Sequence, residues 1–284
     1  ALLLTAKNRK KYFTIAHGND ILKDKYISKF CLNSAERIIV RSNYIKNLVN
    51  SLYQISKKKI KICPDGIIEK KFEIKDNKSK IRKKLNLEPN YFCILTVGIL
   101  NLVRKGFDLV LKSLAEMRDK FGIKINRIKY IVVGRDNPKV RKKLNNLAKN
   151  LELQDNFKIQ VNASDELRNK YYKAADLFVL PSRDYSDRGS VEGFGNSIIE
   201  AAFYKVPSIG SNEGGIKNAI EDGKSGYLIK NFEDLVEKII ILYEDKNLRE
   251  EMGEYAQKRV MNDFIWNKIY ECYFNIFKDS SDFS

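Results

Sequence analysis

The chain has 284 residues, of which 43% are apolar, and its 53 Lys and Arg exceed its 36 Asp and Glu to give a net charge of +17. This length and apolar content favour two domains with sizeable cores. The four cysteines, Cys31, Cys63, Cys93 and Cys272, are far apart in the sequence, which argues against a disulfide framework or a zinc site and favours a reducing compartment. No apolar run approaches the roughly 18 residues that a membrane helix needs.

Three strands with helices between them are predicted in the first third of the chain. The strand runs are KKYFTIAHG (10–18), ERIIVRS (36–42) and KIKICPDG (59–66), and the clearest helix is NYIKNLVNSLY (43–53). Three strands make only half of a doubly wound domain, so we expect a further N-terminal segment to be absent from this chain. Residues 1–66 are therefore interpreted as part of an N-terminal domain.

The basic excess lies in this first third. Residues 1–85 hold 22 Lys and Arg against 7 Asp and Glu, whereas residues 86–284 hold 31 against 29. The asymmetry indicates an anionic partner, such as nucleic acid, a phospholipid surface or an acidic substrate. A lysine-rich solvated surface with no binding role explains it equally well, and no nucleic-acid motif accompanies it.

A lysine-rich segment, residues 69–86, is predicted to link two domains, and beyond it apolar runs alternate with helical patterns. The apolar runs are YFCILTVG, IKYIVVG, NFKIQV, DLFVLPS and VPSIGS. Continuous apolar strands between helices predict a parallel sheet covered on both faces, which binds ligands at the carboxyl ends of its strands. We place the linker and domain entry at 67–90, the second domain at 91–262, and a C-terminal helix that packs back toward the first domain at 263–284.

The turn VEGFG precedes the helical pattern NSIIEAAFYK. Gly193 and Gly195 give the backbone freedom to turn, and a helix that starts near Asn196 presents unpaired amides and a positive dipole end, so we expect a phosphate to bind here. Glu200 lies one turn into this helix, where its carboxylate suits two neighbouring ribose hydroxyls. An equally favoured alternative is a capping box over Ser197–Glu200, in which the glutamate only satisfies the helix start.

These segments together resemble one family. VEGFGNSIIEA with Glu192 and Glu200, LTVGILNLVRKGFDLVLKSL, AHGND, AERIIVRSNYIKNLV and CPDGI occur in the order found in GT-B glycosyltransferases of retaining family 4. The resemblance runs from about Phe13 to about Phe274, and it implies two Rossmann-like, doubly wound α/β domains facing a cleft, with the N-terminal, acceptor-side domain incomplete in this chain. The loop Pro181–Gly195 is similar to that of some mannosyltransferases in the family.

The resemblance implies transfer of a sugar from a UDP- or GDP-sugar donor, with retention of anomeric configuration and without a metal or other cofactor. Carried over by position, Glu200 would hold the ribose hydroxyls. Glu192 and the backbone of Phe194 and Gly195 would face the sugar and the distal phosphate. Lys105 matches the family lysine that neutralises the diphosphate.

His17, the only histidine, matches the family histidine beside the reacting sugar. Taken without the family, a lone histidine before a glycine is more often structural, and the pair Lys105–Gly106 is more often a helix start. The catalytic candidates are His17, Glu192 and Lys105. The donor-binding candidates are Gly98, Arg104, Lys105, Gly193, Phe194, Gly195, Asn196 and Glu200.

Three positions, Ile99, Lys205 and Asn218, depart from the family pattern, and the first bears on phosphate binding. Ile99 stands where the family usually has an arginine, so one of two expected phosphate cations is missing, and Arg104 is the candidate replacement. No covalent nucleophile is evident, and the family implies a front-face substitution in which the departing phosphate helps to deprotonate the acceptor. The alternatives are a weak or inactive GT-B scaffold that acts as a binding partner and, less favoured, a nucleotide-sugar isomerase or a nucleic-acid binder.

The charge map and the resemblance together predict an anionic or lipid-linked saccharide acceptor and no nucleic-acid partner. We expect a cytoplasmic protein that is peripheral on the inner face of an acidic membrane. The segments KNRKKYF (7–13) and SKKKIKI (56–62) are the ones predicted to contact that membrane.

Overall fold

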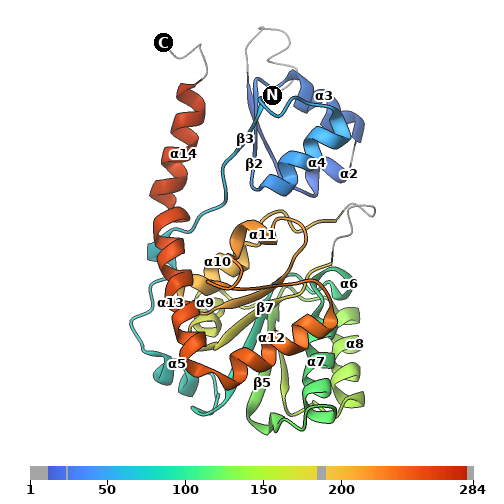
Figure 1. The fold of residues 1–284 in the computed structure, drawn as a ribbon, viewed down its shortest axis with the longest axis vertical. Coiled ribbons are helices and arrows are strands. Elements are labelled where there is room, and N and C mark those ends of the chain that lie inside the picture. The colour runs from blue at the N-terminus through green and yellow to red at the C-terminus, as the bar shows by residue number, and fades with distance from the viewer. Residues whose placement is uncertain (1–11, 24, 184–189, 280–284) are drawn as a thin grey trace.

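The computed structural model describes residues 12–23, 25–183 and 190–279, and it contains two parallel β-sheets, one in each of two domains (Figure 1). The small domain at the top of Figure 1 carries the first sheet, and the larger domain below carries the second. Both sheets are parallel and are covered by helices, so the predicted α/β fold with two Rossmann-like domains is confirmed. The exact domain boundaries stay predictions.

The first sheet consists of the three strands predicted in the first third of the chain, in the order β1-β2-β3. They are β1 (Phe13–Ala16), β2 (Arg37–Val40) and β3 (Ile60–Ile62). The helices are α2 (Asp20–Lys23), α3 (Lys25–Ser34) and α4 (Asn43–Tyr53). The Ser42 hydroxyl caps α4 by accepting from Ile45 N at 3.2 Å, and the helix buries Val49 and Tyr53 in the core of this domain.

The second sheet has the order β6-β5-β4-β7-β8-β9. Its strands are β4 (Phe92–Val97), β5 (Ile128–Gly134), β6 (Phe157–Val161), β7 (Leu177–Leu180), β8 (Ser208–Ser211) and β9 (Gly226–Ile229). The five apolar runs predicted as strands are confirmed as β4 to β8. The edge strand β9 was not predicted, because its residues GYLI lie between the charged segments EDGKS and KNFED and form no longer apolar run.

Helices cover both faces of the second sheet. They are α5 (Lys78–Lys84), α6 (Leu102–Lys105), α7 (Phe107–Asp119), α8 (Pro138–Asn150), α9 (Asp165–Ala174), α10 (Asn196–Phe203), α11 (Ile216–Ala219), α12 (Phe232–Glu244) and α13 (Lys246–Asp263), with 3₁₀ turns at Glu69–Lys71 and Ile125–Arg127. The last helix, α14 (Trp266–Lys278), does not cover this sheet. Along β4, Phe92 and Ile94 pack with α7 and α12, whereas Cys93, Leu95 and Val97 pack on the other face with α9 and α10. Ligand access is therefore left to the ends of the strands.

The segment predicted as a linker is largely packed into the second domain. In α5, Ile81 is fully buried, and Phe72, Leu85 and Leu87 join it in the same core cluster as β4 and α10. The lysines that suggested a linker lie on the solvent side of this helix, since Lys80, Lys83 and Lys84 are exposed.

The chain passes between the domains twice, and its two crossings are paired by backbone hydrogen bonds. Ile67 N donates to Phe264 O at 2.8 Å, and Trp266 N donates to Ile67 O at 2.9 Å. After the second crossing, α14 runs beside the small domain (Figure 1), where the ring of Phe277 meets the ring of Phe13 edge-on at 4.9 Å. This helix follows the second domain in sequence but packs against the first.

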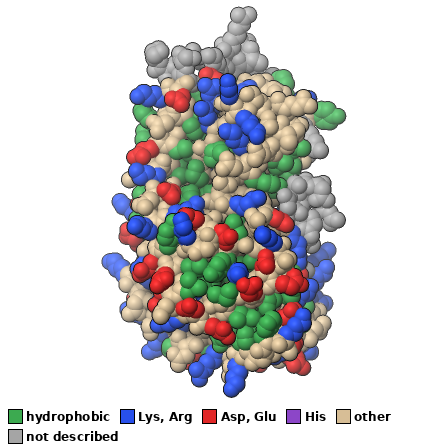
Figure 2. Space-filling model, viewed as in Figure 1, with side chains coloured by type: hydrophobic (Ala, Val, Ile, Leu, Met, Phe, Trp, Pro, Cys, Tyr) green, Lys and Arg blue, Asp and Glu red, His purple; other side chains and the backbone are tan. Residues whose placement is uncertain are grey.

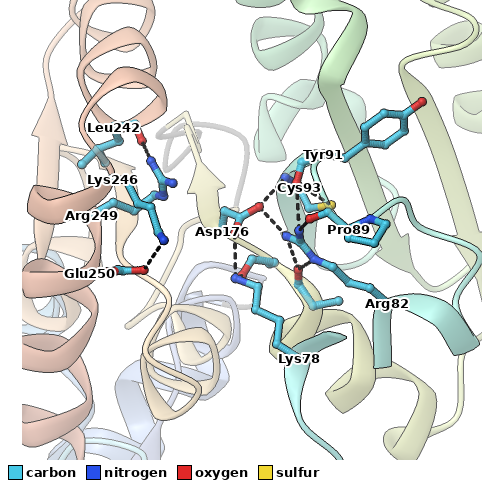
Figure 3. Close-up of polar contacts among 12 residues, drawn as sticks. Lys78, Arg82, Pro89, Tyr91, Cys93, Asp176, Leu242, Lys246, Arg249 and Glu250 are labelled. Carbon is cyan, nitrogen blue, oxygen red and sulfur yellow. Dashed lines mark hydrogen bonds and ion pairs between the residues drawn. The ribbon is translucent and has the colours of Figure 1, made fainter. Parts of the chain in front are cut away.

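A buried arginine fastens α5 to the second domain (Figure 3). Arg82 donates to the backbone oxygens of Ala174 at 2.9 and 3.0 Å, of Pro89 at 2.8 Å and of Tyr91 at 2.9 Å. These carbonyls belong to the end of α9 and to the segment that leads into β4. One side chain thus holds three parts of the domain together.

Asp176, just before β7, supplies the charge that Arg82 needs. Its carboxylate lies 2.5 Å from Arg82 Nη2 and 2.7 Å from Lys78 Nζ, and it accepts from Cys93 N at 2.7 Å (Figure 3). Burial by itself would raise the pKa of Asp176, but the charges of Lys78 and Arg82 outweigh burial and hold that pKa below its ordinary value.

We predict that Asp176→Ala destabilises the protein by about 3–5 kcal/mol, because it leaves the buried Arg82 without a counter-charge. The ionised carboxylate stabilises the fold above its unfolded pKa of about 4, and this contribution is lost as the pH falls through the lower folded pKa. The difference between variant and parent should therefore shrink in acid. Urea unfolding at neutral and acidic pH measures both effects.

The control is Asp119→Ala. The Asp119 side chain is 58% exposed, and its carboxylate lies 2.6 Å from Arg118 Nε. An exposed pair of this kind contributes about 1 kcal/mol or less. Equal losses for the two variants would contradict the role given to Asp176.

Candidate active site

A cavity of about 570 Å³ lies between the two domains, at the carboxyl ends of β1 and β4 and at the start of α10. Side chains from both domains line it. All ten residues predicted for the site are among them: His17, Gly98, Arg104, Lys105, Glu192, Gly193, Phe194, Gly195, Asn196 and Glu200. The structure brings these positions together, while their individual roles stay predictions.

The VEGFG turn packs backbone to backbone against the turn that follows β8. Gly215 N donates to Glu192 O at 2.8 Å, and a Cβ added at Gly215 would lie 1.9 Å from Gly193 O. Gly214 has a φ of 59° and Gly195 a φ of 94°, in the left-handed region that favours glycine. The glycines of both turns are thus needed for the close approach that fixes the position of Glu192.

The helix α10 begins at Asn196, and its N-cap is Gly195, which offers no side chain as a cap. A capping box needs its serine at the N-cap, whereas Ser197 lies inside the helix, so the capping-box alternative is wrong. Glu200 instead accepts a hydrogen bond from the Tyr172 hydroxyl at 2.7 Å and lines the cavity. The helix start and this carboxylate both remain available to a ligand.

Glu200 is held in a mostly buried position beside a cation. Burial raises the pKa of Glu200, and the hydrogen bond from Tyr172 and the charge of Arg168 offset part of this rise. Arg168 Nε lies 3.9 Å from Glu200 Oε2, and the arginine itself lines the cavity. A carboxylate in such a place is well suited to accept hydrogen bonds from hydroxyl groups that replace water.

Two cations of α6 meet Glu192. Lys105 Nζ lies 2.6 Å from Glu192 Oε2, and Arg104 Nη1 lies 3.4 Å from the same oxygen and 3.2 Å from Val191 O. A Cβ added at Gly98 would lie 3.0 Å from Lys105 Cε, so this glycine leaves room for the lysine side chain. A single carboxylate thus neutralises both cations where an anion would bind.

The seam between the domains is built around Val191. This residue precedes Glu192 in the second domain, yet its side chain is buried in the core cluster of the first domain. Val191 N donates to Asn19 Oδ1 at 3.1 Å, and the Ser42 hydroxyl donates to Gly193 O at 2.7 Å. The turn that carries Glu192 is therefore held from both sides of the cavity.

Several lining residues were not predicted from the sequence. Arg41 and Asp65 form an ion pair at 2.8 Å on the first-domain side, and Asn19 and Arg168 also line the cavity. Asn19 and Asp65 lie within the motifs AHGND and CPDGI, which could have pointed to them. Arg41 lies within the motif AERIIVRSNYIKNLV, whereas nothing in the sequence around Arg168 sets it apart from other arginines. Ile99, 55% exposed, lines the cavity and adds no charge.

A second cavity of about 370 Å³ adjoins the first. It shares Val97, Gly98 and Arg168 with the first cavity and extends along the carboxyl ends of β5 and β6 to Arg135 and Asn162. Gly134 allows the ends of β4 and β5 to lie close together here, because a Cβ there would lie 1.9 Å from Gly98 O. Together the two cavities make an elongated site that crosses three strand ends.

Within residues 12–23, 25–183 and 190–279, no group of three or more His, Cys, Asp or Glu side chains could hold a metal ion. No helix in those ranges is long and apolar enough to cross a membrane. The centre of the loop that resembles that of mannosyltransferases, residues 184–189, lies outside the described residues, as do Lys7 to Lys11 of the segment KNRKKYF.

The fold and the site define a GT-B protein with a ligand cavity between its domains. Residues 77–259 match the model of the family Glycosyl transferases group 1, and the chain belongs to this family.

Its curated relatives include a trehalose synthase and a capsular polysaccharide glycosyltransferase. The chain is 26% identical over 263 residues to the trehalose synthase of Thermococcus litoralis, covering 89% of this chain and 59% of that protein. It is 27% identical over 287 residues to the capsular polysaccharide biosynthesis glycosyltransferase CapM of Staphylococcus aureus, covering 95% of this chain and 67% of that protein. The chain thus spans about three fifths of the trehalose synthase.

Solved structures share the fold at lower identity. A glycosyltransferase from Rickettsia africae superposes with a TM-score of 0.83 at 24% identity, over 99% of this chain and 74% of that one. Anabaena Alr3699/HepE in complex with UDP and glucose superposes with a TM-score of 0.80 at 20% identity, over 97% and 73%. These likenesses concern the fold.

We predict that Glu200→Gln raises the melting temperature of the ligand-free protein near pH 8 and that this gain shrinks near pH 4. The folded pKa of Glu200 is raised, so its neutral form favours folding at low pH and this contribution is lost as the pH rises through the folded pKa. A neutral amide removes that loss and can still accept from Tyr172. Thermal unfolding across this pH range measures the effect.

The control is Glu250→Gln on the exposed face of α13, where Glu250 lies 3.5 Å from Lys246. A surface change of this kind should stay within about 0.5 kcal/mol at every pH. If Glu200→Gln instead becomes less stable than the parent as the pH rises, burial does not destabilise the ionised form of Glu200.

Proposed function

We propose that this protein transfers a sugar from a nucleotide-sugar donor to a glycan or lipid-linked acceptor, with retention of anomeric configuration and without a metal. The observation that carries the proposal is a single cavity in which the start of α10, two cations and two carboxylates of one domain face the only histidine, from the other domain. Membership of the family Glycosyl transferases group 1 supports the reaction class.

The nucleoside would occupy the second cavity, with its ribose near Glu200. This cavity is open along the strand ends and meets the first one at Gly98 and Arg168. A carboxylate can accept from both ribose hydroxyls. The complex of HepE with UDP and glucose supports UDP as the first nucleotide to test, and GDP as the second.

The diphosphate would lie between the start of α10 and the side chains of Arg104 and Lys105. Negative charge grows on the diphosphate as the bond to the sugar breaks, and fixed cations and amide donors aimed at it lower the barrier. Lys105 is bound to Glu192 at 2.6 Å in the ligand-free protein. Donor binding would therefore exchange a carboxylate for a phosphate at the lysine.

The sugar and the acceptor would meet between Glu192 and His17. Glu192, once released from Lys105, is positioned to accept from sugar hydroxyls, and the exposed His17 lies at the acceptor-side wall. The described cavity residues include no serine or cysteine paired with a base, which favours front-face substitution without a covalent intermediate.

The acceptor would be anionic or lipid-linked, and the protein would be cytoplasmic and peripheral on an acidic membrane. The first domain exposes Tyr26, Ile27 and Phe30 on α3, and Lys57 and Lys58 are exposed in SKKKIKI. Lys59 Nζ donates to Asn33 O at 2.5 Å, so this lysine segment lies beside the end of α3. Exposed aromatic rings beside lysines are typical of a surface that binds anionic lipid.

The charge distribution on the face shown in Figure 2 does not favour a nucleic-acid partner. Figure 2 shows Lys and Arg side chains on both domains, with Asp and Glu side chains interspersed among them, mainly on the larger one. On that face they form no continuous basic stripe of the kind that follows a phosphate backbone.

We predict that Lys105→Ala weakens UDP binding by about 1.5–3 kcal/mol, roughly 10- to 150-fold, since it removes a charge-assisted contact to the diphosphate. Isothermal titration measures the affinity, and release of UDP from UDP-sugars measures turnover. Lys112→Ala on the exposed side of α7 is the control and should bind as the parent does. Parental affinity and turnover in Lys105→Ala would contradict the assignment.

Glu192→Gln is the companion variant, and we expect it to change the affinity for UDP in the opposite direction. It removes the carboxylate that competes for Lys105, so bare UDP should bind at least as tightly as to the parent while turnover of the sugar donor falls. UDP binding without any turnover of UDP- or GDP-sugars in the parent would favour the inactive scaffold.

We predict that the protein co-sediments with anionic vesicles at low salt and much less with neutral ones, because each lysine near such a surface contributes about 1 kcal/mol and is screened within roughly 10 Å. Phe30→Ser and the pair K57Q/K58Q should each reduce sedimentation.

Matched controls lie on the second domain. Phe121, 58% exposed, compares with Phe30, 60% exposed, and the exposed Lys142 and Lys143 compare with the lysine pair. Phe121→Ser and K142Q/K143Q should leave sedimentation unchanged. Equal partition to neutral and anionic vesicles would instead favour a soluble acceptor.

A further inference from the structure

Two cysteines that are 209 positions apart meet where α14 packs on the first domain. Cys63 follows β3 and is fully buried, and Cys272 lies in the middle of α14 and is half-buried. They belong to one apolar cluster with Ile39, Ile269 and Ile276.

The thiol groups point toward each other's segments. Cys63 Sγ lies 3.8 Å from Ile269 O, one turn before Cys272, and Cys272 Sγ lies 3.5 Å from Ile62 O, next to Cys63. Each thiol therefore lies against the backbone of the segment that carries the other thiol. Both thiols are free in this structure.

The surroundings of the two thiols favour ionisation of one of them. The neighbouring Cys63 thiol and the charge of Arg41 outweigh burial and lower the pKa of Cys272 to about 7, so about half of this partly exposed group is a thiolate at pH 7. Cys63 is the opposite case, because the neighbouring Cys272 thiol and burial raise the pKa of Cys63. An accessible thiolate beside a buried resolving thiol is the arrangement that favours disulfide exchange.

We propose that Cys63 and Cys272 form a reversible disulfide that fastens α14 to the first domain. The Cys272 thiolate attacks a small disulfide such as oxidised glutathione, forming a mixed disulfide and releasing one thiolate. Cys63 then gives its proton to that thiolate and displaces the second glutathione. The two protein sulfurs are oxidised to the disulfide, and one glutathione disulfide is reduced to one thiol and one thiolate, which takes up a proton from solvent.

The disulfide between Cys63 and Cys272 would affect the cavity through Arg41. Arg41 Nη1 donates to Cys63 O at 3.2 Å and to the hydroxyl of Tyr273 in α14 at 2.6 Å, and its Nε pairs with Asp65. Arg41 and Asp65 both line the cavity. The position of α14 on the first domain therefore sets the position of an ion pair in the site, and oxidation would fix it.

The inference does not depend on the proposed function, and its test needs no substrate. The full chain is equilibrated with oxidised glutathione and digested without reduction for peptide mapping. The expected result is a linked pair of peptides that contain Cys63 and Cys272. Oxidation should also slow hydrogen exchange in α14 and raise the melting temperature, and dithiothreitol should reverse all three changes.

Cys272→Ser and Cys63→Ser should each abolish the linked peptide and both stability effects, whereas Cys31→Ser, which changes a half-buried cysteine on α3, should retain them. Circular dichroism of each variant establishes that it is folded. Stable glutathione adducts at Cys272 without the linked peptide, or a bridge that uses Cys31, would overturn the proposal.

Discussion

The pairing of the two chain crossings at Ile67 is the constraint on which the rest of the structure depends. Two hydrogen bonds, to Phe264 O and from Trp266 N, join the crossings into a short two-stranded hinge. The hinge fixes the distance between the domains and leaves a cavity between them. It also directs α14 back along the first domain, where this helix reaches Arg41 through Tyr273. A local backbone contact thus determines which side chains face each other across the site.

The cavity is lined by two neighbouring cations and the start of a helix, an arrangement that is typical of anion-binding sites. Arg104 and Lys105 lie near the start of α10, and both pair with Glu192. Buried cations without such a partner would cost several kcal/mol each, so the carboxylate stabilises the fold around the cavity. The same carboxylate lowers the gain from binding a phosphate, because it must first be displaced. The contacts of Glu192 Oε2 therefore raise the stability of the protein and at the same time lower its affinity for a phosphate.

Much of this arrangement could be predicted from the sequence. Continuous apolar runs predicted eight strands, and the glycines of the VEGFG turn together with Glu200 predicted where a ligand would bind, since these signals are local. What was missed depends on contacts between distant segments. Arg168 meets Glu200 from another helix, and Cys63 meets Cys272 across most of the chain, so their spacing in sequence says nothing of their distance in space. The capping-box alternative failed because the N-cap of α10 is Gly195, two residues before Ser197, which that motif requires at the N-cap.

The position of α14 makes the small domain discontinuous. Its sheet comes from the beginning of the described chain, while the helix that covers Cys63 and Phe13 comes from the end. During synthesis from the N-terminus, the larger domain can fold as a unit before α14 leaves the ribosome, whereas the apolar face beside β3 stays uncovered until then. The packing of α14 on the first domain would therefore be the last part of the described structure to form, and a nascent chain would need protection of that face rather than of its larger core.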